Sequence, residues 1–139
     1  MPAVIVEYLR SPFTPARKGG LSRMRPDDVA SIVVRELIER TGINPELIED
    51  VIIGCAFPEG EQGFNLARMI TFLSDLPNSL GGVTINRFCG SSMQAIHDAT
   101  GRIAMGAGEA FICGGVESMT RIPMTGFNPM PNPKLADDY

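Results

Sequence analysis

Short apolar runs along the chain alternate with stretches in which apolar residues recur at helical spacing. Four of the runs, at residues 3–9, 50–57, 83–88 and 109–114, are largely apolar, and the first is rich in β-branched side chains. Runs of this length are typical of strands that are covered on both faces of a sheet. We therefore predict four buried strands, the first of them ending at a loop that begins at Arg10.

Between these runs, three segments repeat apolar residues at intervals of three and four, which is the spacing of one face of a helix. In the first segment, Pro26, Asp27 and Asp28 occupy the opening turn and Gly42 follows the last apolar residue. Proline and carboxylates favour the start of a helix and glycine its end. Two of the predicted helices cover residues 26–41 and 63–74, and the third is marked by apolar residues from Met93 to Ile103 and closes near Gly106.

Because strands and helices alternate along the chain, we predict the α/β class: a layered fold with a mostly parallel sheet and right-handed crossovers. The pattern stops near residue 119, and four prolines fall between residues 123 and 133. No apolar period survives in this last segment. We therefore divide the chain at this point, into residues 1–118 and 119–139.

Charge and hydropathy exclude several classes of protein. The net charge is −4 and the basic residues are scattered, whereas binding to nucleic acid requires clustered Lys and Arg. No apolar run approaches the roughly 18 uncharged residues of a membrane span. The first residues lack the basic region and the cleavage site of a secretory signal. We therefore expect a cytoplasmic protein that binds neither nucleic acid nor membrane.

The three cysteines and the single histidine fit neither a disulfide framework nor a structural zinc site. Cys55 and Cys113 lie in apolar strand runs, where cysteine packs as a small hydrophobic residue. The chain also lacks the glycine patterns of dinucleotide and phosphate loops. We therefore predict no metal site and no resident cofactor.

Cys89 occurs in a different setting, between the end of a predicted strand and the start of a predicted helix. The first turn of a helix has free N–H groups and a partial positive charge, which favour a thiolate. Gly90 would let a substrate carbonyl approach, and the N–H group of Cys89 could donate to an oxyanion. Taken alone, the residue fits a core cysteine as well as a nucleophile, but the neighbouring Gly90, Ser91 and Ser92 favour a functional role.

A nucleophile at Cys89 would need a base from elsewhere in the molecule. A helix terminus contributes only ~0.3–1 kcal/mol, too little to ionise an ordinary thiol fully at pH 7. His97 follows eight residues later on the same helix, about 12 Å along its axis, and cannot reach the sulfur. We interpret His97 as structural, and Glu59 and Glu61 as part of a solvated loop and helix cap.

The segment Asn86-Arg87-Phe88-Cys89-Gly90-Ser91-Ser92-Met93-Gln94-Ala95 resembles the nucleophile motif of the thiolase family. Three further segments agree with that family in the same order, at residues 4–13, 60–63 and 114–124, so the resemblance covers nearly the whole chain. The amino-acid sequences of residues 61–65 and 93–98 are most similar to those of 3-ketoacyl-CoA thiolases of fatty-acid oxidation. Short-chain acetoacetyl-CoA thiolases are the next most similar group.

The resemblance implies that Cys89 is the catalytic residue of an acyltransferase. In thiolases the corresponding cysteine attacks a 3-ketoacyl-CoA, releases acetyl-CoA and holds the acyl group until free CoA accepts it. The reverse reaction is a Claisen condensation, and coenzyme A is a substrate rather than a cofactor. The family also implies an α/β/α fold with two similar halves, assembled as a homodimer or homotetramer. Residues 1–118 would belong to the first half, and residues 119–139 would begin its inserted loop domain.

Thiolases are much longer than this chain, and the remaining catalytic groups lie downstream in the family: the activating histidine, a second cysteine and an oxyanion-binding asparagine. We therefore expect the rest of a thiolase polypeptide as a partner, and no turnover by these 139 residues alone. A sheet edge and an apolar face should remain unpaired. Substrate-binding residues remain unassigned.

Two other interpretations compete with the nucleophile-bearing half of a thiolase. One is a thiolase-like module that binds or carries acyl-CoA without full catalysis. The other is a ketosynthase-type condensing enzyme that uses acyl-carrier substrates. The second is disfavoured because the Cys89 segment and residues 114–119 match thiolases.

Overall fold

Three parallel strands form the centre of the molecule. In the computed structural model, which describes residues 2–135, β1 (Ile48–Gly54) lies between β2 (Gly81–Ile85) and β3 (Ala110–Gly115). Both pairings are parallel, with Ile52 opposite Val83 on one side and opposite Cys113 on the other. The predictions of a parallel sheet and of strands in these three regions are confirmed.

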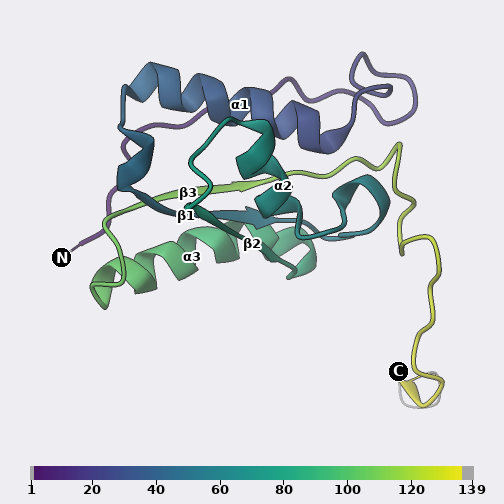
Figure 1. The fold of residues 1–139 in the computed structure, drawn as a ribbon. Helices are drawn as coiled ribbons and strands as arrows, with labels where there is room; N and C mark the ends of the chain where they lie inside the picture. The colour runs from purple at the N-terminus through teal and green to yellow at the C-terminus, as the bar shows by residue number, and fades with distance from the viewer. Residues whose placement is uncertain (1, 136–139) are drawn as a thin grey trace.

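Helices cover both faces of the sheet and make a three-layered α/β/α arrangement (Figure 1). On one face lie α1 (Pro26–Thr41) and α2 (Leu66–Leu73), and on the other lies α3 (Ser91–Ala104). The helix α2 connects β1 to its neighbour β2, and α3 connects β2 to β3 on the other side of β1, so each connection between successive parallel strands passes through a helix. Short 3₁₀ turns occur at Pro45–Leu47, Gly60–Gln62 and Phe88–Gly90.

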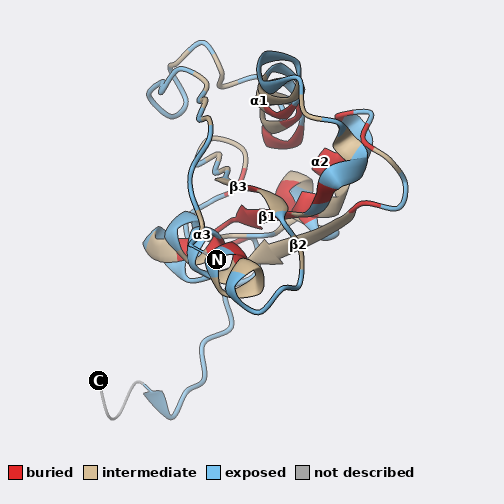
Figure 2. Ribbon diagram, turned by 90° about the vertical axis from the view of Figure 1, so that its left-hand side faces the viewer, coloured by how far each residue is buried: buried red, intermediate tan, exposed pale blue. Residues whose placement is uncertain are grey.

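The core has two parts, one on each face of β1. Val51 and Ile53 point towards α1 and α2, whereas Ile52 points towards α3, as the alternation of side chains along a strand requires. Burying one such side chain contributes about 1.5–3 kcal/mol. Figure 2 shows the buried residues between the layers. The larger cluster includes Val34, Leu66, Ala67, Ile70 and Ile112, and the smaller includes Ala95 and Ala99.

The ends of α1 follow the sequence signals. Pro26 occupies the first turn with two carboxylates, and Gly42 ends the helix with a φ of 62°. The N–H group of Gly42 donates to Ile38 O at 2.9 Å, which satisfies one of the last carbonyls. A glycine adopts this left-handed conformation without a steric penalty.

Other boundaries differ from the predicted ones for local backbone reasons. The strand predicted at 50–57 ends at Gly54, and the strand predicted at 83–88 ends at Ile85, where the chain turns towards α3. The helix predicted at 63–74 begins only at Leu66, because Phe64 and Asn65 both have a φ of 54°. Residues in the left-handed region cannot belong to a right-handed helix.

The prediction of a buried strand at residues 3–9 is wrong. This segment is not in a strand, and Val4, Ile5 and Val6 are 76%, 75% and 83% exposed. A strand needs a neighbouring backbone to complete its hydrogen bonds. Among residues 2–135 the three strands pair only with one another, so the apolar run has no ladder to join. Its hydrophobic pattern reports a tendency to be buried but does not specify a pairing partner.

The segment after β3 is irregular, as the prolines predict. Residues 116–134 contain turns rather than helices or strands, and the last part runs away from the sheet (Figure 1). The division of the chain into domains at residue 119 stays a prediction. Among residues 2–135, no helix is both long enough and apolar enough to cross a membrane.

Two glycines allow α3 to approach the sheet closely. A Cβ on Gly54, at the end of β1, would collide with the backbone of Ser91 and Ser92 at the start of α3. A Cβ on Gly115, at the end of β3, would collide with the side chain of Ser92. The amino end of α3 therefore lies directly against the carboxyl ends of β1 and β3.

We predict that Gly54→Ala lowers the free energy of unfolding by about 1–3 kcal/mol, because the new methyl group meets backbone atoms that cannot move without shifting α3. The matched control is Gly101→Ala within α3, where a Cβ would have no neighbour within 4 Å. It should raise the free energy of unfolding by about 0.5–1 kcal/mol, since alanine favours the helix. Urea unfolding measures the free energy of unfolding of both variants. An equal change in the two variants would contradict the close packing of α3 against Gly54.

Candidate active site

The segment that carries Cys89 lies at the carboxyl edge of the sheet. Hydrogen bonds continue across this edge beyond the strands, from the Cys55 N–H group to Ile85 O at 2.9 Å and from the Val116 N–H group to Gly54 O at 3.1 Å. The three segments that follow the strands therefore stay together. In α/β sheets this edge is the usual place for ligands.

A tight turn connects β2 to α3 and contains Cys89. The buried hydroxyl of Ser91 accepts a hydrogen bond from the Arg87 N–H group at 2.8 Å and donates one to Phe88 O at 2.6 Å. The carboxamide oxygen of Asn86 accepts the Phe88 N–H group at 3.0 Å. Phe88 has a φ of 46°, a conformation that costs roughly 1–2 kcal/mol for a non-glycine residue. These hydrogen bonds hold the backbone in that conformation.

Cys89 is exposed at the amino end of α3, one residue before the helix cap Gly90. The prediction that it lies between a strand end and a helix start is confirmed. Gly90 has no side chain with which to cap the first turn, so the partial positive charge of the helix acts on the space in front of it. An exposed sulfur at this position is accessible to a substrate. A core cysteine, the other interpretation that the residues left open, does not fit.

The other two cysteines pack in the interior, as predicted. Cys55 is 1% exposed, and burial followed by the charge of Glu117 raises the pKa of its thiol to about 12. Cys113 is partly buried, and burial raises the pKa of its thiol to about 11. Its sulfur lies 3.4 Å from Ala95 O. Both remain protonated at neutral pH and are poor nucleophiles.

The titratable residues that we interpreted as structural, His97, Glu59 and Glu61, lie outside the turn. His97 is exposed on α3. Glu59 accepts the Phe127 N–H group at 2.7 Å, and Glu61 forms ion pairs with Arg121 and Arg25. The hydrogen bond from Arg121 lowers the pKa of Glu61. The two carboxylates anchor the segment after β3 through these contacts instead of capping a helix.

Sequence reasoning gave no role to Gln62, a completely buried residue at the same edge of the sheet. Its amide bonds to the segments that follow β1 and β3. Glutamine in a predicted loop is usually exposed. The burial of Gln62 and its hydrogen bonds therefore become visible only in the folded structure.

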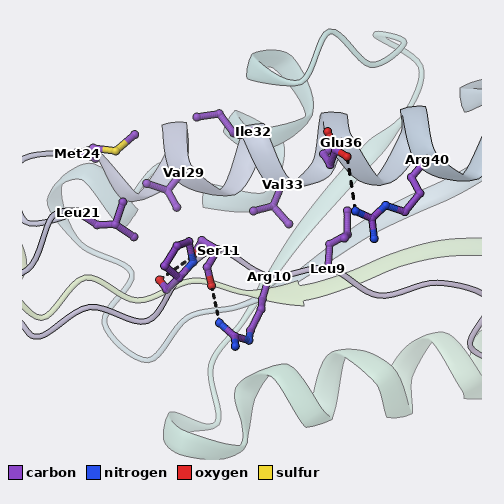
Figure 3. A pocket seen from close by; sticks show the side chains of 11 residues that line it. Leu9, Arg10, Ser11, Leu21, Met24, Val29, Ile32, Val33, Glu36 and Arg40 are labelled. Carbon is purple, nitrogen blue, oxygen red and sulfur yellow. Dashed lines mark hydrogen bonds and ion pairs between the residues drawn. The ribbon is translucent and has the colours of Figure 1, made fainter.

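A separate groove lies away from the cysteines. It has a volume of about 350 Å³ and runs between residues 9–12 and α1, where Val29, Ile32 and Val33 line it (Figure 3). An ion pair between Glu36 and Arg40 at 3.7 Å closes one end. This groove is formed by the exposed amino-terminal segment and is not part of the Cys89 turn.

Comparison with known proteins shows the family of the chain. Residues 3–139 match the family model described as the N-terminal domain of thiolase. The chain belongs to the thiolase family. The predicted membership of the thiolase family is therefore confirmed over nearly the whole chain.

Individual relatives agree with this assignment. The chain is 46% identical to a 3-ketoacyl-CoA thiolase of Bacillus subtilis over 97% of its own length and 34% of the relative. It is 42% identical to the corresponding Colwellia psychrerythraea thiolase over 96% of its length and 36% of that protein. The chain thus spans about a third of the length of these thiolases.

A solved thiolase structure has the same fold. The crystal structure of the Bacillus anthracis acetyl-CoA acetyltransferase superposes with a TM-score of 0.69 at 34% sequence identity. The match covers 73% of this chain and 26% of that one. The prediction of a thiolase-like layered α/β fold is confirmed.

We predict that iodoacetamide alkylates Cys89 of this thiolase domain well before Cys55 and Cys113. At pH 8, thiols with pKa values of about 12 and about 11 are ionised only to roughly one part in ten thousand and one in a thousand. Their labelling should rise about tenfold for each pH unit between 7 and 9, because this range lies below both pKa values. Peptide mass spectrometry follows each site, and labelling in denaturing urea is the control. Equally fast labelling of Cys55 in the folded chain would contradict the site.

We predict that Ser91→Ala lowers the free energy of unfolding by about 1–3 kcal/mol, because the Arg87 N–H group and Phe88 O both lose a hydrogen-bond partner. The neighbouring Ser92 is exposed, and Ser92→Ala should change stability by less than about 0.5 kcal/mol. Thermal or urea unfolding compares the two variants. Equal stability of both would show that the Ser91 hydroxyl does not hold the turn.

Proposed function

We propose that Cys89 is the acyl-accepting nucleophile of a thiolase that transfers acyl groups between coenzyme A thioesters. The main support is the exposed position of its sulfur at the amino end of α3, in a chain of the thiolase family. Relatives named 3-ketoacyl-CoA thiolase favour a 3-ketoacyl-CoA as substrate. The structural relative is named an acetyl-CoA acetyltransferase, which is consistent with the reverse condensation.

The proposed reaction has two halves. The Cys89 thiolate attacks the C3 carbonyl carbon of the substrate, and the carbonyl electron pair moves onto oxygen. Collapse of this intermediate breaks the C2–C3 bond, and the bonding pair stays on C2, which takes up a proton to give acetyl-CoA. The thiolate of free CoA then attacks the acyl carbon and displaces Cys89 as a thiolate. An N–H group at the start of α3 would stabilise the oxyanion.

The rest of the thiolase polypeptide would supply the base. The sequence has one histidine, His97, and its exposed position on α3 gives it no part in this proposal. In the proposed function an activating histidine, a second cysteine and an oxyanion-binding asparagine come from outside this chain. Coenzyme A is a substrate, and no resident cofactor is required. Assembly as a homodimer or homotetramer and a cytoplasmic location stay predictions.

The first test is covalent capture of the acyl group on the full-length polypeptide. Brief exposure to acetyl-CoA should add one acetyl group at Cys89, because Cys89 is the exposed one among Cys55, Cys89 and Cys113. Peptide mass spectrometry locates the group. Cys89→Ser should lose acylation and reduce thiolysis of acetoacetyl-CoA by roughly a thousandfold or more, because a hydroxyl is a far weaker nucleophile.

Cys113→Ser is the control for this test, since it changes a cysteine that packs in the interior and should leave acylation at Cys89 intact. Acylation at Cys55 or Cys113 would contradict the proposed function. Acyl-CoA binding without transfer to Cys89 would favour the non-catalytic binding module instead.

A further inference from the structure

At the carboxyl edge of the sheet, both the nitrogen and the oxygen of the Gln62 side-chain amide form hydrogen bonds. Its Nε2 atom donates to Phe57 O at 2.8 Å and to Glu117 Oε1 at 2.7 Å, and lies 3.3 Å from Cys55 Sγ. Its Oε1 atom accepts the Ser118 N–H group at 2.6 Å. Gln62 is completely buried, so these contacts replace all of its hydrogen bonds to water.

This set of contacts requires an amide. Phe57 and Cys55 belong to the segment after β1, whereas Glu117 and Ser118 belong to the segment after β3. An amide can donate from nitrogen and accept at oxygen within one planar group, while a carboxylate can only accept. A methionine would fill a similar volume without either function. The polar atoms of Gln62 therefore fix the positions of the two segments relative to each other. An apolar side chain would fill the space between the segments but would not hold them by hydrogen bonds.

Further contacts connect these segments to the turn that carries Cys89. The second carboxylate oxygen of Glu117 accepts the Ala56 N–H group at 2.6 Å. Asn86 Nδ2 donates to Ala56 O at 2.9 Å, and Asn86 Oδ1 accepts the Phe88 N–H group at 3.0 Å. Phe88 directly precedes Cys89.

A packing contact runs in parallel with this hydrogen-bonded route. The aromatic rings of Phe57 and Phe88 lie with their centroids 6.0 Å apart, within the range of favourable ring pairs. Gln62 is therefore connected to Phe88 by two routes. One runs through its hydrogen bond to Phe57, whose ring packs against Phe88. The other runs through the hydrogen bonds of Glu117, Ala56 and Asn86. Because Phe88 has a left-handed backbone, its conformation depends on such supports.

We propose that Gln62 is a positioning residue for Cys89, which sets the orientation of the nucleophile by joining the segments after β1 and β3 to the Cys89 turn. The inference rests on the proposed function, in which Cys89 accepts the acyl group. Gln62 touches neither substrate nor sulfur of Cys89 in this role. It acts through the backbone between Asn86 and Phe88.

The experiment compares Gln62→Met and Gln62→Glu with the wild type in the full-length polypeptide. Gln62→Met keeps the volume and removes the hydrogen bonds, whereas Gln62→Glu keeps the acceptor for Ser118 and places a carboxylate against Glu117. Three quantities are measured: kcat and KM for acetoacetyl-CoA with CoA, the rate of Cys89 alkylation by iodoacetamide, and the melting temperature.

We expect kcat to fall by about tenfold to a hundredfold in both variants, with KM changed by less than about threefold, because a misplaced nucleophile affects the reacting geometry rather than binding. The alkylation rate of Cys89 should change in parallel, and alkylation needs no substrate. The control is Asp50→Ala, which removes a side chain that bonds to Arg102 and to the Val51 N–H group near the other end of β1. It should lower the melting temperature without changing kcat or the alkylation rate.

Unchanged kcat and alkylation in a folded Gln62→Met variant would overturn the positioning role. A kcat loss in Asp50→Ala as large as that of the Gln62 variants would overturn it as well, because general destabilisation would then explain both. If the Gln62 variants do not fold, Glu117→Gln replaces them. It keeps Gln62 but has one acceptor oxygen where Glu117 uses two, so it loses the bond from either Gln62 or Ala56. A wild-type protein that is not acylated at Cys89 would instead refute the proposed function, while the alkylation rates would still report on Gln62.

Discussion

The close approach of a helix to the ends of two strands is the constraint on which the rest of the structure depends. Gly54 and Gly115 have no Cβ, and this lets the first turn of α3 lie against β1 and β3. Ser91 is consequently buried beside the sheet, and the turn before it is forced outward. Cys89, two residues before the buried Ser91, is exposed.

The turn itself is held by polar groups from all three segments that follow the strands. Ser91 and Asn86 satisfy the backbone around Phe88, and the amide of Gln62 connects the segments after β1 and β3. Such a network is rigid only when each member has its partners. Among the described residues, every buried side-chain nitrogen and oxygen has a hydrogen-bond partner. Because these hydrogen bonds are all made, the strained backbone of Phe88 can persist next to the proposed nucleophile.

Regular periodicity made most of the fold predictable from the sequence. Three strands and three helices follow from apolar spacing, and Pro26 and Gly42 mark the ends of the first helix correctly. The position of Cys89 follows from its place between an apolar run and a glycine-serine segment. Residues 3–9 misled the prediction because hydrophobicity does not identify a pairing partner. The role proposed for Gln62 could not be predicted, since its contacts join residues far apart in the sequence.

A crystal structure of the full-length polypeptide soaked with acetyl-CoA tests the central claim most directly. The account predicts an acetyl group covalently bound to Cys89 Sγ, with its carbonyl oxygen directed at N–H groups where α3 begins. Cys89 enclosed in hydrophobic packing, or an acetyl group bound to another side chain, would contradict it.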